Sequence, residues 1–236
     1  MSISAQSSQA LSPKDQQRFR EWPYAHQTCL TCGMCASTCP VSGVDGFDPR
    51  KVVRLLALGM ETPLVESRWP WICTMCGKCE TLCPSGIDIA DAMRRIRGLR
   101  ARDEVPGILQ QGLTAALEVG NNLRMPKDDF VWTMEDVAEE LAEEEGYDDF
   151  KIFLDKPGAR VLTTVHNKLA NTHTDDLKHW WKIFHAAGED WTIATDNWEG
   201  TSWGYFTGDD EAMKIMAGRI IENMERLNID TLLWPE

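Results

Sequence analysis

Cysteine is absent from most of this 236-residue chain: none occurs before Cys29, between Cys39 and Cys73, or after Cys83. Thiol chemistry is therefore confined to two short segments. Long apolar runs are also missing, because the longest candidate, around Val52–Met60, is interrupted by Arg54 and falls short of the roughly 18 residues of a membrane span. No targeting segment is visible in the polar residues 1–20, so we expect a soluble, cytoplasmic protein.

Basic charge is scarce in the second half of the chain. The formal net charge is −13. Residues 21–104 carry ten acidic and ten basic side chains, whereas residues 105–236 carry 26 acidic and 11 basic ones. A nucleic-acid-binding surface needs a basic stripe or patch, so we predict that nucleic acid is not a partner.

The eight cysteines form two runs of identical spacing. Each run reads C-x-x-C-x-x-C-x-x-x-C-P, the spacing of bacterial two-cluster ferredoxins. In that pattern three thiolates of a run bind one cluster, and the fourth, just before the proline, reaches the other cluster. We therefore predict two [4Fe–4S] clusters with crossed ligands. Cluster I would take Cys29, Cys32, Cys35 and Cys83, and cluster II would take Cys73, Cys76, Cys79 and Cys39.

Zinc and disulfides are the structural alternatives to iron and sulfide. Paired C-x-x-C motifs also make four-thiolate zinc sites, but zinc would need only two cysteines of each run and leaves the matched third and fourth unexplained. A disulfide framework fits poorly because no secretory signal is visible and the chain is long for a stapled mini-domain.

The overall pattern predicts an α+β protein: a mostly helical two-cluster module followed by a small α/β domain with a short parallel sheet. The module is expected to span residues 21–104, after an N-terminal extension of residues 1–20. Asp48-Pro49 should open a helix that stops at Gly59, and Asp88 should cap a second helix after the second run. In that second helix the arginines are expected to form a solvated face or, alternatively, to dock an acidic partner. They are Arg94, Arg95, Arg97, Arg100 and Arg102.

Trp69 and Trp71 precede the second run. We expect them to pack around cluster II, where they could shield it from water and tune its potential.

The remaining residues divide into an acidic helical bridge, residues 105–157, and the α/β domain, residues 158–236. Glu135–Glu145 has the pattern of a solvent-facing helix rather than a metal site. Strands are expected at 160–166, 190–196 and 230–234, alternating with helices at 174–187 and 208–227, which implies parallel pairing through right-handed crossovers. A sheet of three strands would leave an edge or face for a partner to cover.

Residues 29–102 resemble the C-type iron–sulfur component of heterodisulfide reductases. The resemblance rests on both cysteine runs, on Phe47-Asp48-Pro49-Arg50-Lys51 with Leu58-Gly59, on Trp71-Ile72-Cys73, and on Cys83-Pro84-Ser85-Gly86-Ile87-Asp88. It implies a non-catalytic electron-transfer subunit of a cytoplasmic heterodisulfide reductase-like complex. Its partners would be a flavin-containing A-type subunit and a B-type subunit with CCG motifs, which acts on a thiol–disulfide substrate. Disulfide reduction and sulfur oxidation are the two settings that the family suggests, and the cysteine-free α/β domain favours the second.

The C-terminal domain resembles a trimmed CCG domain without its cysteines. His166 stands near the first cysteine position of that family, and Glu199-Gly200-Thr201-Ser202-Trp203-Gly204 stands where Glu-x-Cys-Cys-Gly would be. With no soft ligand beside it, His166 is not expected to bind a metal. The domain is therefore expected to be a scaffold or docking face.

Two other functions remain open. One is the iron–sulfur subunit of a 2-hydroxy-acid dehydrogenase, of the glycolate or lactate kind, or of a succinate/fumarate-type complex, since the same helical ferredoxin arrangement occurs there. The other is a structural interaction subunit whose clusters are architectural.

Overall fold

The computed structural model describes residues 29–235. The predicted N-terminal extension and the predicted start of the cysteine module at Glu21 lie outside these residues. By its internal contacts the chain divides into two compact units, which are described separately here. The first comprises the residues up to Pro106 together with Phe206–Gly208, and the second comprises Gly107–Tyr205 and Asp209–Glu236.

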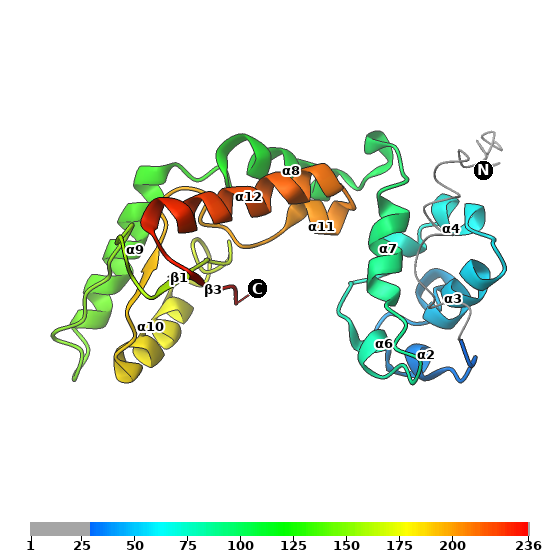
Figure 1. Ribbon diagram of the computed structural model, residues 1–236, viewed down its shortest axis with the longest axis horizontal. Coiled ribbons are helices and arrows are strands. Elements are labelled where there is room, and N and C mark those ends of the chain that lie inside the picture. Colours follow the sequence, from blue (N-terminus) through cyan, green and yellow to red (C-terminus); the bar gives the residue numbers. More distant parts are fainter. Residues whose placement is uncertain (1–28, 236) are drawn as a thin grey trace. The chain divides into compact units, whose positions relative to one another are not determined.

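The first unit is built from short helices and, within its described residues, has no strand. Figure 1 shows α7 alongside α2, α3, α4 and α6, the helices that carry and connect the cysteine loops. The elements are α2 (Met34–Thr38), η2 (Val44–Gly46), α3 (Pro49–Ala57), α4 (Thr62–Glu66), α5 (Trp69–Ile72), α6 (Lys78–Thr81), α7 (Ile89–Arg97) and η3 (Arg102–Glu104).

Both predicted helices of this unit are present, and aspartates cap both. The Asp48 side chain accepts a hydrogen bond from the Arg50 amide at 2.8 Å, which satisfies one of the free donors at the start of α3. The Asp88 side chain does the same for the Asp91 amide at 2.7 Å at the start of α7. Gly59, with φ of +66°, follows the end of α3, as its sequence position predicts.

The core of the first unit lies between α3, α4 and α7. In α3 and α7 the buried residues recur mainly at spacings of three and four, so each helix turns one apolar stripe inward, and α4 adds the adjacent pair Leu64 and Val65. Half-buried Trp69 closes one side, with its ring edge-on to that of Phe47 at 6.3 Å. The buried members are Phe47, Val52, Leu56, Leu64, Val65, Ala92, Met93 and Ile96.

The second unit contains all the described strands. Its three strands form one parallel sheet in the order β2-β1-β3. Val161 pairs with Trp191 on one side and with Thr231 on the other. The elements are α8 (Gly107–Val119), α9 (Lys127–Ala142), β1 (Val161–Thr163), α10 (Asp175–Ala187), β2 (Trp191–Ile193), α11 (Trp203–Thr207), α12 (Asp210–Leu227) and β3 (Thr231–Leu233). The last two residues of α11 belong to the first unit.

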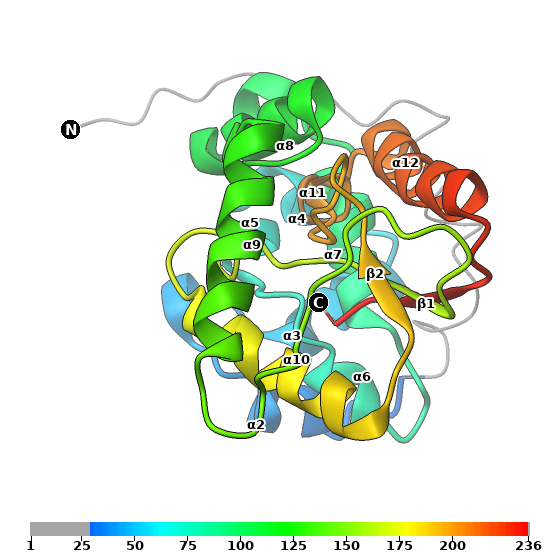
Figure 2. The same cartoon turned by 90° about the vertical axis from the view of Figure 1, so that its left-hand side faces the viewer.

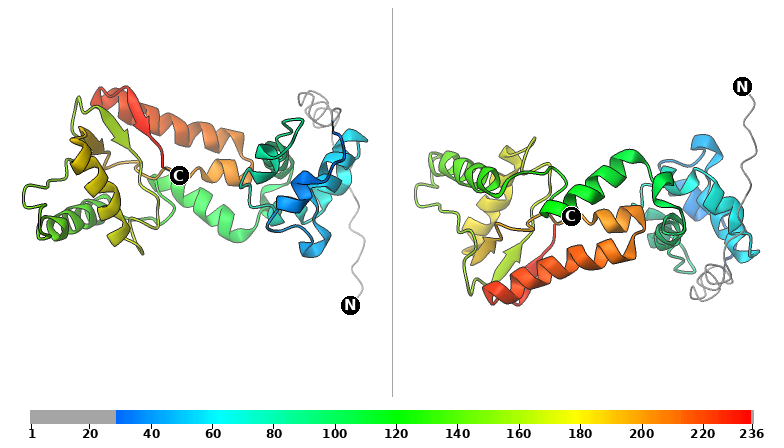
Figure 3. Two further views of the ribbon diagram at one scale, coloured as in Figure 1. Left: turned by 90° about the horizontal axis from the view of Figure 1, so that it is seen from below. Right: turned by 90° about the horizontal axis from the view of Figure 1, so that it is seen from above.

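The predicted alternation of strands and helices is therefore confirmed, with somewhat shorter strands than the sequence suggested. The long helix α12 starts at its Asp209 cap, whose side chain accepts from the Ala212 amide at 3.0 Å. It ends at Asn228, whose φ of +53° turns the chain towards β3. Figure 3 shows α8 beside α12, and the two helices are in contact.

Helices cover both faces of the sheet. Side chains alternate along a strand, so neighbouring residues face opposite layers. Val161 packs with α9 and α10, whereas Leu162 packs with Leu227 and Met224 of α12. Figure 2 shows the strands between α12 and the pair α9 and α10. The face that we expected a partner to cover is thus already covered within the chain.

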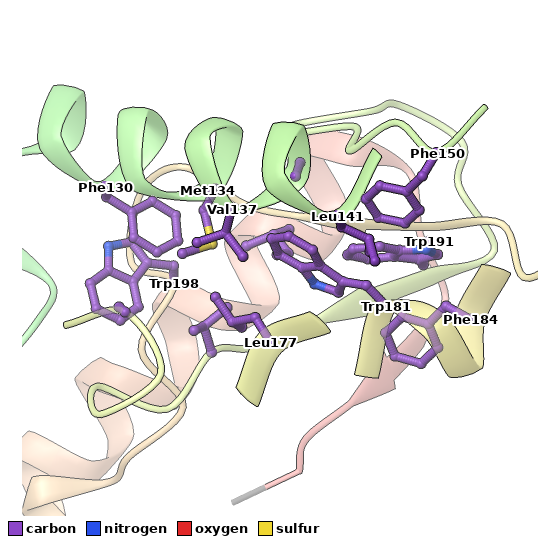
Figure 4. Close-up of a cluster of buried hydrophobic side chains, with 14 of the residues drawn as sticks. Phe130, Met134, Val137, Leu141, Phe150, Leu177, Trp181, Phe184, Trp191 and Trp198 are labelled. Atoms are coloured by element: carbon purple, nitrogen blue, oxygen red, sulfur yellow. The ribbon is translucent and has the colours of Figure 1, made fainter. Parts of the chain in front are cut away.

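The larger core, between α9, α10 and the sheet, is rich in aromatic rings. Phe130 of α9 stacks on Trp198 with ring centres 4.3 Å apart, and Trp181 of α10 lies fully buried beside Trp191. Figure 4 shows the α9 side chains pointing down onto those of α10. Most acidic side chains around Glu135–Glu145 are exposed, as expected of a solvent-facing helix, and α9 starts earlier, at Lys127, and buries its opposite face.

The edges of the sheet differ. Leu154 forms an isolated parallel bridge with Ile193, and the Asp155 amide donates to the Ile193 carbonyl at 2.9 Å, so the outer edge of β2 is partly paired. β3 has no strand on its outer side among residues 29–235. Among the same residues, no helix is both long enough and apolar enough to cross a membrane.

Candidate functional site

The two cysteine loops share one backbone geometry. Thr31 and Met75, each just before the second cysteine of its run, have φ of +57° and +54°. Gly33 and Gly77, just after that cysteine, have φ of +82° and +73°. A left-handed turn on both sides of one cysteine curls each loop, and three cysteines of each run line one cavity.

A short helix follows each loop. The amides of Ala36 and Ser37 donate to the Gly33 carbonyl at 3.0 and 3.1 Å, and those of Glu80 and Thr81 donate to the Gly77 carbonyl at the same distances. These bonds start α2 and α6, which place the third cysteine of each run in a first helical turn. Proline after the fourth cysteine ends each segment, because it cannot continue a helix.

Packing of α2 against α6 brings the two runs together. As a result, each of two cavities is lined by four cysteines, three from one run and the fourth from the other. The grouping is the same as that of the predicted ligand sets, although iron binding by these sulfurs remains a prediction. Cavity I is lined by Cys29, Cys32, Cys35 and Cys83, and cavity II by Cys39, Cys73, Cys76 and Cys79.

Apolar side chains of α3, of α7 and of the segments just before these helices form part of the walls. Val53 and Ile87 line cavity I, and Phe47 and Pro49 line cavity II. Ile89, only 1% exposed, lines both cavities and so stands between them. Four cysteines with an apolar wall are the donor set and surroundings that a [4Fe–4S] cluster uses.

The thiols differ in exposure and acidity. Burial raises the pKa of Cys35 and of Cys73, and raises that of Cys79 to about 12. The Lys78 amide hydrogen bond lowers the pKa of the exposed Cys76. Iron binds the thiolate and stabilises it directly. The buried thiols are therefore expected to ionise when iron binds them rather than as free thiols.

No group of three or more His, Cys, Asp or Glu side chains within residues 29–235 converges on a point where one metal ion could sit. A [4Fe–4S] cluster does not need such convergence, since each of its four irons takes its own thiolate.

Arg97 corrects the expectation of a solvated arginine face. This residue is only 4% exposed, at the end of α7. Nε donates to the Pro70 carbonyl at 2.8 Å, Nη2 donates to the Cys73 carbonyl at 2.6 Å, and Nη1 lies 2.8 Å from the Met75 sulfur. Its guanidinium lies 5.1 Å from the centre of the Trp71 ring. The sequence carried a signal for this, because Arg97 is four residues after Met93 and eight after Ile89, on the buried face of the helix.

The other described arginines of this segment are more exposed or pair locally. Arg94 and Arg95 both contact the Asp91 carboxylate, at 3.0 and 2.6 Å. Arg100 donates to the Val65 carbonyl and lies 3.3 Å from Glu104.

Tryptophan packing beside cavity II agrees with the expectation for Trp69. This ring packs in the cluster of side chains that includes Cys39 and Cys73, and its Nε1 donates to the Asp45 carbonyl at 3.2 Å. Trp71 instead lies under the Arg97 guanidinium. Both side chains thus support the loop that carries the second run.

In the second unit, Glu199 is a buried acid that sequence reasoning did not single out. It is 4% exposed and accepts from the Asn122 amide at 2.6 Å, Trp203 Nε1 at 3.0 Å and Asn167 Nδ2 at 3.1 Å. Burial nevertheless raises its pKa. The half-buried His166 accepts at Nδ1 from the Lys168 amide at 3.1 Å, and burial lowers its pKa.

Comparison with known proteins identifies the module that carries the cavities. A family described as a 4Fe-4S dicluster domain matches residues 25–87. A protein of Archaeoglobus profundus, described as like the C-type subunit of heterodisulfide reductase, is 34% identical over 100 residues, which cover 41% of this chain and 53% of that protein.

Two further relatives match over a shorter stretch. The C-type iron-sulfur subunit of the CoB–CoM heterodisulfide reductase of Methanopyrus kandleri is 36% identical over 76 residues, 32% of this chain and 40% of that protein. The C-type subunit of the ferredoxin:CoB–CoM heterodisulfide reductase of Methanosarcina mazei is 35% identical over 75 residues, 32% of this chain and 46% of that protein. The chain thus spans about half, or less, of the length of these relatives. Its cysteine-bearing part is thus a dicluster module with two [4Fe–4S] clusters, and it is similar to the C-type iron–sulfur subunits of heterodisulfide reductases.

Proposed function

We propose that this chain is the electron-transfer subunit of a heterodisulfide reductase-like complex and passes single electrons between a flavoprotein subunit and a subunit that acts on a disulfide or thiol. The observation that carries the proposal is the pair of four-cysteine cavities that share Ile89 as a common wall. Two centres so placed in one small unit suit relay of electrons better than storage at separate sites.

In this proposal cluster I is held by Cys29, Cys32, Cys35 and Cys83, and cluster II by Cys73, Cys76, Cys79 and Cys39. When bound, a [4Fe–4S] cluster supplies reversible uptake of one electron. The surrounding residues control it. Apolar walls from Val53, Ile87 and Phe47 limit water, and the Met75 amide, 3.4 Å from the Cys73 sulfur, donates to a ligand atom. Both effects tune the reduction potential.

The partners follow from the kind of complex. The names of the relatives place them in heterodisulfide reductases, and we propose a flavin-containing A-type subunit and a CCG-containing B-type subunit for this chain. The disulfide chemistry would then take place on the B-type subunit. We further propose a cytoplasmic complex that works in sulfur oxidation.

Anaerobic purification from the native host tests the proposal directly. Iron and sulfide are counted per chain, and every subunit that co-purifies is identified. About eight irons per chain, together with a flavoprotein and a CCG-containing subunit, are expected. About four irons, or zinc in their place, would contradict the cluster assignment. Eight irons with a 2-hydroxy-acid flavoenzyme as partner would keep the relay and reject the heterodisulfide complex.

A further inference from the structure

The two cavities are walled by matched helices that end differently. α3 and α7 are both nine residues long, and each starts directly after its capping aspartate. Counted from that cap, the last residue is Ala57 in α3 and Arg97 in α7. The two halves of the module therefore differ at this matched position, where α3 has the methyl side chain of Ala57 and α7 has the buried guanidinium of Arg97.

Arg97 holds its charge against the loop of the second run. It donates to the backbone carbonyls of Pro70 and Cys73, and it also contacts the Met75 side chain in the same loop. Cys73 and Met75 both line cavity II. A cation with so little exposure is weakly screened by solvent, so its field at the neighbouring sulfurs is strong.

Cavity I has a different set of charges. Arg50 lines it, but the Arg50 side chain is 47% exposed and lies 3.7 Å from the Asp48 carboxylate, which offsets its charge. The Asp48 carboxylate also acts on Cys35, a cavity I thiol, as a neighbouring negative charge. On the side of cavity II, exposed Lys78 adds a second positive charge. Solvent and the nearby anion thus weaken the positive field at cavity I.

A cluster gains one negative charge when it takes up an electron, so a nearby cation stabilises the reduced form. We propose that Arg97 raises the reduction potential of cluster II above that of cluster I. With both clusters bound, this difference would favour an electron on cluster II over one on cluster I. Arg97 thus acts on cluster II through its charge, as a positioning residue that raises the reduction potential without binding the cluster. The inference rests on the proposed ligand sets but not on the identity of the partner subunits.

Redox titration of the purified, cluster-loaded full chain tests this proposal, with the paramagnetic signals of the reduced clusters as the readout. The wild-type chain should show two midpoint potentials, and a Cys76→Ala variant, which disrupts cluster II, should lose the upper one. In Arg97→Gln the upper midpoint potential should fall by about 59 mV. For a one-electron couple this equals about a tenfold loss in the ratio of reduced to oxidised cluster at a fixed potential. The lower midpoint should move less.

Two variants separate the charge from the scaffold. Arg95→Gln removes the same charge from the same helix at a more exposed site that pairs with Asp91, and it should leave both midpoints in place. Arg97→Lys keeps the charge without the guanidinium fork, and its upper midpoint should stay close to that of the wild type.

The proposal is overturned if Arg97→Gln keeps its full iron content and its upper midpoint does not move, or if only the lower midpoint moves. It is also overturned if the upper midpoint potential falls as far in Arg97→Lys as in Arg97→Gln, because the charge, which lysine keeps, would then not be the cause. If Arg97→Gln loses iron, the Arg97→Lys variant decides the question. If Arg97→Lys keeps both clusters and the wild-type upper midpoint, the proposal is supported. If Arg97→Lys also loses cluster II, Arg97 serves only as a scaffold and the proposal is overturned. Partner subunits are absent from the experiment, so its outcome is independent of the proposed complex.

Discussion

At the scale of single residues, Cys39 belongs to one cysteine run by sequence and to the cavity of the other run in the structure. It closes the first cysteine run, yet it lines the cavity of the second run together with Cys73 and Cys79. Cys83 lies in the converse arrangement, at the cavity of the first run. This crossing makes a prediction that single substitutions test poorly, because loss of any ligand can damage a cluster.

Pairs of substitutions test the crossing more sharply. If Cys39 serves the same cluster as Cys76, Cys39→Ala combined with Cys76→Ala should still retain about four irons per chain, since both changes damage one cluster. Cys39→Ala combined with Cys32→Ala should lose nearly all iron, since each change damages a different cluster. Iron and sulfide analysis of the anaerobically loaded variants gives the answer. The opposite order of iron contents would show that each run binds its own cluster.

Glu199 gives a pH-dependent prediction. Burial raises its pKa above the ordinary 4.5, so the folded chain binds this proton more tightly than the unfolded chain does. The contribution to stability is full below pH 4.5 and is lost as the pH rises through the raised pKa. Glu199→Gln cannot ionise, so its free energy of unfolding relative to the wild type should improve as the pH rises above 4.5 and level off above the raised pKa. Urea unfolding at a series of pH values measures this. A difference that is constant with pH would contradict it.

The buried charged residues are also the part of the candidate site that the sequence did not predict. The cysteine spacing was enough to predict both groups of four thiols that line the cavities. It did not predict that Arg97 would be buried, because a run of arginines usually marks a solvated surface and burial depends on acceptors from a distant loop, Pro70 and Cys73. Glu199 was missed for the same reason, since its donors come from Asn122 and Asn167, far away in the sequence.

At the scale of elements, two glycines in or next to α12 have opposite roles. A Cβ on Gly204 of α11 would lie 2.3 Å from the Met213 backbone nitrogen, so Gly204→Ala should cost about 1–3 kcal/mol through forced displacement of α12. A Cβ on Gly218, inside α12, would meet nothing within 4 Å. Gly218→Ala should therefore stabilise the chain by about 0.5–1 kcal/mol, because alanine is the better helix former. Denaturant midpoints of both variants check the pair, and equal effects would refute the packing argument.

Capped, periodic elements were the ones that could be predicted. Asp48 and Asp88 each begin a helix as expected, and Asp209 caps α12 in the same way, since a side-chain oxygen satisfies one of the first free amides. The five-residue helix α4 and the four-residue helix α5 were missed, because they are too short to show a period. In α9 the apolar positions follow one face of the helix, but a window that begins at Glu135 omits its first half. The complete face comprises Phe130, Met134, Val137, Ala138 and Leu141.

At the scale of the whole molecule, the two units depend on different sources of stability. The cores of the second unit contain only side chains of ordinary apolar type, without cysteine. In the first unit, cysteines pack directly against Val53, Ile87 and Ile89. Folding of the cysteine loops should therefore be coupled to iron, whereas folding of the sheet should not.

Hydrogen exchange of the iron-free chain tests this difference. After iron is removed by a chelator, amides of α2 and α6 should exchange at least tenfold faster than in the loaded chain, because loss of the clusters removes the links between the two runs. Amides of β1, β2 and α12 should keep their protection. Faster exchange in β1 on removal of iron would show that the two units fold together.

Ile89 has a consequence for how the protein decays in air. This buried side chain of α7 lines both cavities. Oxidative loss of one cluster would leave Ile89 facing a hollow, which opens a route for oxygen and water to the neighbour. Damage should then be cooperative: aerobic preparations would contain mostly chains with both clusters or with neither, and few with one.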